Sequence, residues 1–165
     1  MKILVTGFEP FGGESRNPSM ELVQSLPGEI GGAEIVTAIL PVTGRGSVDA
    51  VTAAIRVNAP DVVLSIGQAG GRAAVTVERV AVNVDDFRIP DNNGDQPVDA
   101  PIAADGPDAY LCRLPVRAMV EAMRAAGVPA EISNSAGTYV CNHLMYAVAH
   151  LLAREYPAAR HGFIH

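Results

Sequence analysis

The sequence contains no tryptophan and only two cysteines, Cys112 and Cys141, among its 165 residues. Two cysteines are too few for a disulfide framework, and their spacing matches no metal-binding motif. Free thiols are typical of a reducing compartment, so we expect a cytoplasmic protein without a metal site.

Long hydrophobic runs are also missing. The apolar segment from Met1 to Phe8 is followed at once by Glu9 and Pro10, whereas a secretory signal needs a longer apolar core. No segment approaches the roughly 20 apolar residues that span a bilayer. These patterns favour a chain that is neither exported nor bound to a membrane.

Basic residues are few. The chain has 12 Lys and Arg against 18 Asp and Glu, a formal net charge of −6, and its basic residues do not cluster. A nucleic-acid-binding protein needs a basic face, so we expect no nucleic-acid partner. Hydrophobic residues make up 48% of the chain and charged residues 18%, which is typical of a folded protein rather than a disordered one. The length fits one domain, residues 1–165.

Strand-like and helix-like patterns alternate along the sequence. Asn17 is a good helix N-cap, and Pro18 suits the first position of a helix. We predict strands at 3–5, 34–40, 61–67, 75–84, 130–133 and from 162, and helices at 18–26, about 48–58, about 116–126 and 142–155. Such alternation predicts an α/β fold, a three-layer α/β/α domain with a mostly parallel twisted sheet like those of phosphorylases and hydrolases.

In sheets of this kind, ligands bind beyond the carboxyl ends of the strands. Four predicted strands lead into polar or glycine-containing segments, so we expect these segments to meet along one edge. They are Gly7-Phe8, Gly67-Gln68, the segment from Ser135 to Cys141, and His165.

Residues 85–114 break the alternation. This segment has little periodicity, several Asp, Asn and Gly turn signals, and four prolines: Pro90, Pro97, Pro101 and Pro107. Long loops without regular structure are uncommon unless they are functional, so we interpret the segment as a lid or interface loop.

Cys141 is the sharpest chemical signal. It follows a turn of small residues and lies near the predicted start of a helix, where the helix dipole favours a thiolate and backbone N–H groups are available for an oxyanion. The alternative, an inert buried cysteine, is about equally well supported by this segment alone.

A nucleophilic cysteine needs a base and a group that orients it. Among the four histidines, His165 ends a strand at the expected ligand edge and is best placed to face Cys141 from another element. Strand alternation places Glu78 on an apolar face, where a carboxylate needs a partner such as an imidazolium. The alternative for Glu78, an ion pair with an arginine such as Arg79, is favoured by the pattern alone.

Two glycine-rich segments, 7–13 and 67–71, are typical of loops where the backbone approaches a ligand. Neither has the spacing of a dinucleotide-binding or phosphate-binding loop. Two of the four phenylalanines, Phe8 and Phe11, fall in the first loop, although phenylalanines most often pack in the core.

Several segments together resemble the type I pyroglutamyl peptidases, also called pyrrolidone-carboxylate peptidases. They occur in the order of that family along the whole chain. The matching segments are Thr6-Gly-Phe-Glu-Pro-Phe-Gly-Gly13 with Asn17-Pro18, Gly67-Gln-Ala-Gly-Gly-Arg72, Glu78-Arg-Val-Ala-Val-Asn83, Arg88-Ile-Pro-Asp-Asn92, Ser135-Ala-Gly-Thr-Tyr-Val-Cys-Asn-His143 and Gly162-Phe-Ile-His165.

The resemblance implies a catalytic triad of Cys141 as nucleophile, His165 as acid and base, and Glu78 as the residue that orients His165. It also implies a cytosolic, cofactor-free cysteine peptidase that hydrolyses the bond after an N-terminal pyroglutamyl residue and forms a homo-oligomer, a dimer or tetramer. The residues that it assigns to substrate are Phe8, Phe11, Asn17, Gln68 and, near the oxyanion, Arg88.

Members of that family continue past the histidine with a further strand and a C-terminal helix, so the resemblance implies a shortened chain in which this helix is absent. Two other functions fit parts of the pattern. The same architecture serves nucleoside phosphorylases, which would depend on phosphate and ignore thiol reagents. A non-catalytic pyroglutamyl-peptide binding protein would bind such peptides without hydrolysing them.

Overall fold

The fold is built on a seven-stranded sheet with the order β2-β3-β1-β4-β9-β5-β8. The computed structural model describes all residues, 1–165. The strands of this sheet are β1 (Lys2–Phe8), β2 (Glu29–Ile30), β3 (Ala33–Leu40), β4 (Val62–Ile66), β5 (Val75–Glu78), β8 (Ala130–Ser133) and β9 (Arg160–Ile164). Neighbours pair in parallel except β2 with β3 and β5 with β9. The expected mostly parallel α/β sheet is confirmed.

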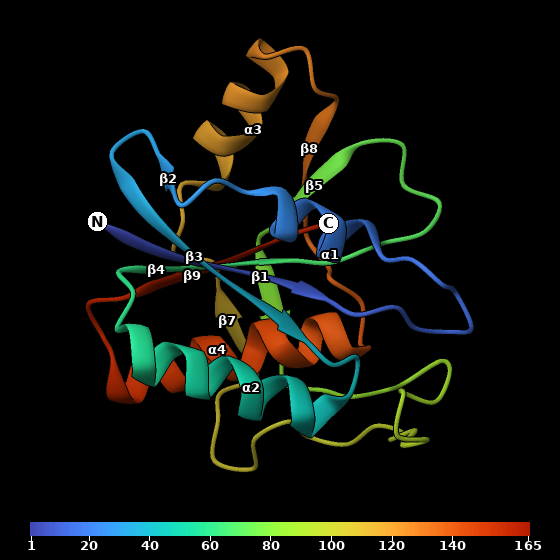
Figure 1. The fold of residues 1–165 in the computed structure, drawn as a ribbon. Helices are drawn as coiled ribbons and strands as arrows, with labels where there is room; N and C mark the ends of the chain where they lie inside the picture. The colour runs from blue at the N-terminus through green and yellow to red at the C-terminus, as the bar shows by residue number, and fades with distance from the viewer.

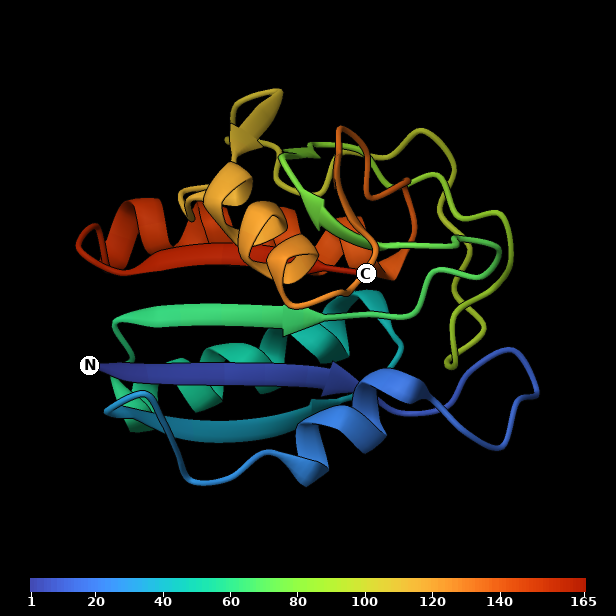
Figure 2. The ribbon, with the colours of Figure 1, turned by 90° about the horizontal axis from the view of Figure 1, so that it is seen from above.

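Four helices cover the two faces of the sheet. They are α1 (Pro18–Ser25), α2 (Gly44–Asn58), α3 (Val116–Ala125) and α4 (Val140–Glu155). Figure 1 shows α2 and α4 side by side on one face, with α1 and α3 on the other, and the view from above in Figure 2 agrees. None of these helices is long and apolar enough to cross a bilayer.

The main hydrophobic core lies between the sheet and the helix pair α2 and α4. Leu4, Val63 and Phe163 of the sheet and Val51 and Leu144 of the helices have no exposed surface. A much smaller cluster, Val77, Val120 and Ala130, lies under α3. Because α4 is held along the larger core, its first turn has a fixed position relative to the ends of β4 and β9.

The single strand predicted at 75–84 is wrong in detail. The chain forms β5 up to Glu78 and then β6 (Val80–Val82), which pairs in a separate two-stranded sheet with β7 (Ala109–Leu111). The break falls at Arg79, whose N–H donates to Ser133 across the strands while its carbonyl accepts from Cys112. Alternation alone could not show that one apolar run serves two sheets.

The segment 85–114 is also less irregular than predicted. It contains β7, and an isolated bridge joins Asp85 to Ala100 near its start. The expected gathering of four strand ends at one edge is only partly correct. Strands β1, β4 and β9 end together, but β8 runs opposite to β9, so the turn after Ser133 carries the chain to the start of α4.

Candidate active site

The predicted base and its orienting carboxylate are in contact. Nδ1 of His165 lies 2.8 Å from Oε1 of Glu78, and the two side chains are 3% and 0% exposed. The antiparallel pairing of β5 with β9 brings them together, since the backbone N–H of His165 donates to Thr76, two residues before Glu78. Of the four histidines, only His165 contacts this carboxylate.

The other three histidines have partners elsewhere. His143 is bonded to Asp85, and His150 to Tyr110. His161 is buried within the sheet, where Nε2 lies 3.3 Å from the Ser65 hydroxyl. The Glu78 carboxylate therefore orients none of these three imidazoles.

Glu78 has a second ionic partner, and it is not the one that the sequence pattern suggested. Nη1 of Arg72 lies 2.6 Å from Oε1 of Glu78, whereas Arg79 bonds to Asn134. Burial opposes ionisation of the Glu78 carboxyl group, but the His165 imidazole, the nearby Ser133 hydroxyl and the Arg72 guanidinium together hold its pKa below the usual value. The carboxylate is therefore ionised at neutral pH. Arg72 was not among the expected site residues, although it ends one of the family-like segments.

Cys141 lies in the first turn of α4, which begins two residues earlier than predicted. The sulfur rests against the end of β4: a Cβ atom added to Gly67 would lie 3.0 Å from Sγ and 2.9 Å from the ring of Phe163. The Phe163 ring in turn packs on His165, with ring centroids 4.8 Å apart. Gly67 thus leaves the space that the sulfur and the Phe163 ring occupy, and the Phe163 ring packs on His165.

The surroundings of Cys141 favour the neutral thiol. Burial raises its pKa to about 12, the Glu78 carboxylate adds to the increase, and the Arg72 guanidinium opposes it. The helix dipole was expected to favour a thiolate, whereas burial acts in the opposite direction. The sulfur must therefore lose its proton to a base before or during attack.

A pocket opens beside the sulfur. It is lined by Phe8, Phe11, Asn17, Val42, Gln68, Tyr139, Val140 and Cys141. Four of the five expected substrate residues are thus next to the expected nucleophile. Arg88 is the exception: it is exposed and does not line this pocket. Burial raises the pKa of the Tyr139 phenol, and Arg88 is near enough to oppose part of that increase.

The two polar side chains of the pocket, Asn17 and Gln68, differ in whether their hydrogen-bonding atoms already have partners. Asn17 is fully engaged: Oδ1 accepts from the N–H and hydroxyl of Ser19, and Nδ2 donates to the Glu9 carbonyl. The Ser19 hydroxyl also accepts from the N–H of Phe8, so Asn17 fixes the loop that carries the aromatic rings. Oε1 of Gln68, by contrast, is buried and has no partner.

Tyr139 is a pocket residue that the sequence analysis did not single out. Its ring centroid lies 6.3 Å from that of Phe11 and 4.8 Å from that of Phe87, and its hydroxyl donates to the Pro90 carbonyl. Its position directly before the helix that carries Cys141, in a chain with only four tyrosines, was the available signal.

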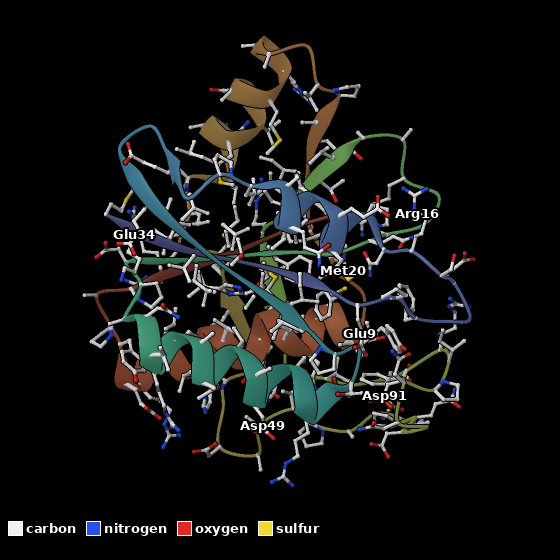
Figure 3. All side chains as sticks on the ribbon, in the orientation of Figure 1. Glu9, Arg16, Met20, Glu34, Asp49 and Asp91 are labelled. Carbon is white, nitrogen blue, oxygen red and sulfur yellow. The ribbon has the colours of Figure 1, made fainter.

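The segment after β6 is hydrogen-bonded to the loop that carries Phe11. Nδ2 of Asn92 donates to Oε1 of Glu9 and to the Pro10 carbonyl, each at 3.0 Å. Asp91 accepts from the N–H of Gly44. Figure 3 shows Glu9 and Asp91 near one another, on the side of the molecule where β1 ends. Residues 91 and 92 are thus bonded to the start of α2 and to the loop that carries Phe11.

The family model for pyroglutamyl peptidase matches residues 1–165. The chain belongs to the pyroglutamyl peptidase family. The peptidase is 57% identical, over its full length and 78% of the relative, to a pyrrolidone-carboxylate peptidase of Finegoldia magna, and 56% identical to one of Levilactobacillus brevis, of which it covers 81%.

Solved structures agree with this assignment. The peptidase superimposes on pyroglutamyl peptidase I of Bacillus amyloliquefaciens with a TM-score of 0.98 and 47% identity, covering 99% of this chain and 79% of the other. It superimposes on pyrrolidone carboxyl peptidase of Thermococcus litoralis with a TM-score of 0.96 and 43% identity, covering 99% and 75%. The family consists of cysteine peptidases that remove N-terminal pyroglutamate, and the peptidase has that activity.

Proposed function

We propose that Cys141, His165 and Glu78 carry out this hydrolysis as nucleophile, acid–base and orienting carboxylate. The observation that supports the proposal most directly is the 2.8 Å contact between His165 and Glu78. With Nδ1 held by the carboxylate, Nε2 is the nitrogen left to exchange protons with the sulfur and the substrate.

The first step is acylation. His165 takes the proton from the Cys141 thiol as sulfur attacks the carbonyl carbon of the pyroglutamyl residue. Tyr139, at the N-cap of α4, makes no side-chain hydrogen bond to the first turn, so backbone N–H groups there are free for the oxyanion. Arg88 adds positive charge from the exposed side of Tyr139. The imidazolium then protonates the departing amine, which leaves a thioester on Cys141.

The second step is deacylation. Neutral His165 removes a proton from a water molecule as its oxygen attacks the thioester. Collapse of that intermediate breaks the carbon–sulfur bond, releases pyroglutamate and returns the proton to sulfur. Glu78 stays ionised throughout and stabilises the imidazolium form that appears in both steps.

Specificity for pyroglutamate follows from the pocket. The lactam is flat and uncharged, so the aromatic side chains Phe8, Phe11 and Tyr139 suit its faces. Oε1 of Gln68, which lacks a partner, accepts from the lactam N–H. An N-terminal prolyl ring lacks the lactam carbonyl and carries a charged secondary ammonium group that this largely apolar pocket would have to desolvate, so prolyl peptides are expected to be poor substrates. Asn17 acts by fixing the loop.

The remaining expectations are part of the same proposal. The segment 85–114 borders the pocket and acts as a lid or interface loop of a single peptidase domain. Both cysteines are free, which fits a cytoplasmic enzyme. We propose that it works as a homo-oligomer, a dimer or tetramer.

The test is hydrolysis of a pyroglutamyl chromogenic amide by the wild type, Cys141→Ala and Gln68→Leu. We expect no turnover by Cys141→Ala and a loss in kcat/KM of about 10–100-fold for Gln68→Leu, since one buried hydrogen bond is lost. Cys112→Ala, at the other free thiol, is the matched control and is expected to remain active and sensitive to iodoacetamide. Normal turnover by Cys141→Ala would overturn the mechanism.

A further inference from the structure

Arg72 joins two parts of the site that come from different strands. Nη1 donates to Oε1 of Glu78 at 2.6 Å, the same oxygen that is bonded to His165, and also to the Thr76 hydroxyl. Nη2 donates to the carbonyl of Ser135 at 3.2 Å, in the turn that leads to the helix of Cys141. One guanidinium group therefore contacts both the orienting carboxylate and the segment before the nucleophile.

The ionic balance of the site depends on this residue. A carboxylate with no exposed surface requires a positive partner. If His165 were the only partner, the paired state would be carboxylate with imidazolium, in which the base already carries the proton that it must accept. A guanidinium is always charged and can supply the compensating charge instead. The imidazole can then stay neutral while it keeps its hydrogen bond to Glu78.

Building on the proposed triad, we propose that Arg72 is a positioning residue that compensates Glu78 so that His165 is free to accept the Cys141 proton. Arg72 does not line the pocket beside the sulfur, so it acts on the acid–base step and not on recognition of the lactam. Its charge also opposes the increase that burial causes in the pKa of Cys141.

The experiment compares the wild type with Arg72→Gln and Arg72→Lys, with Arg79→Gln as the matched control. Arg79 lies one residue after Glu78, and the only hydrogen bond of its side chain is to Asn134. The readouts are the pH dependence of kcat and KM on a pyroglutamyl chromogenic amide, and the pH dependence of Cys141 alkylation by iodoacetamide. Thermal unfolding of each variant shows whether it is folded.

The acidic limb of kcat/KM reports the protonation of His165. For Arg72→Gln we expect it to move up by about one to three pH units, which is the size of pKa shift that one adjacent charge causes in a carboxyl group. On the acidic limb, each pH unit of this shift lowers kcat/KM at a given pH by about tenfold. KM should change by less than about threefold, because uniform binding is not affected. The pH dependence of Cys141 alkylation should also move to higher pH. Arg72→Lys should recover part of both shifts, and Arg79→Gln should match the wild type.

A folded Arg72→Gln variant with the pH profile of the wild type would overturn the inference. So would a lower activity at all pH values with an unmoved profile and a lower melting temperature, because that pattern marks a purely structural role. The alkylation readout needs no turnover. If the wild type failed to hydrolyse the amide, the proposed function would fail by itself, and the alkylation shift would still decide the role of Arg72.

Discussion

Glu78 ends β5 and His165 directly follows the antiparallel strand β9, and their side chains meet at 2.8 Å with neither exposed by more than 3%. The contact fixes which imidazole nitrogen is free. It also places a charge that the fold must compensate, and Arg72 does so. In the proposed mechanism the site therefore consists of four groups and not three.

Replacing Glu78 with Gln keeps the shape of the side chain but removes its charge. We expect kcat to fall by about 100-fold or more, since the amide can present its N–H to Nδ1 and cannot stabilise the imidazolium. KM should stay nearly constant because Glu78 does not line the substrate pocket. Steady-state kinetics on a pyroglutamyl amide measures both. An unchanged kcat would show that Glu78 has no part in the reaction.

The thiol of Cys141 should react slowly with alkylating agents in the free enzyme at neutral pH. Its pKa is raised to about 12, so only a small fraction is thiolate, and that fraction grows tenfold per pH unit. Iodoacetamide inactivation should therefore accelerate by about tenfold per unit from pH 7 to 10. A plateau already reached below pH 7 would instead indicate a preformed thiolate–imidazolium pair. Cys112→Ala removes the second thiol from the measurement.

Gly67 is expected to tolerate no side chain. A Cβ there would lie 2.9 Å from the Phe163 ring and 3.0 Å from Sγ of Cys141, so Gly67→Ala should displace the sulfur or the ring. We expect a fall in kcat of at least about tenfold, because small displacements of reacting groups are costly. Gly70→Ala is the matched control, since a Cβ at Gly70 meets nothing within 4 Å. Equal activity of the two variants would contradict this interpretation.

His161 should make the fold sensitive to mild acid. Burial lowers its pKa to about 3 in the folded state, whereas the unfolded chain binds this proton below the ordinary value of 6.5. Between these values the unfolded state holds more protons, so the free energy of unfolding rises with pH. It falls by up to about 1.4 kcal/mol per unit as the pH drops from 6.5 toward 3.

Denaturant unfolding at several pH values between 4 and 7 checks this prediction. His161→Gln cannot take up the proton, so its stability should depend less steeply on pH than that of the wild type, whatever its stability at pH 7. Identical slopes for the two proteins would show that His161 is not the group responsible.

Local sequence patterns were sufficient to predict the alternation of strands and helices and the candidate reactive residues. Asn17 and Pro18 predicted the start of α1, and the hydrogen bond from the Ser19 N–H to Asn17 confirms this cap. The family-like segments predicted Cys141, His165 and Glu78 as the triad, because motifs of this kind are short and contiguous. Patterns of this kind act over a few residues, which is the range that a sequence shows directly.

Tertiary structure alone decided the partners. The run 75–84 looks like one strand, and only packing divides it at Arg79 between two sheets. Which arginine pairs with Glu78, and how strongly burial holds the proton on Cys141, depend on neighbours that lie far apart in the sequence. Ionisation and pairing respond to distance and burial in space, so they become fixed only once β5, β9 and α4 are packed together.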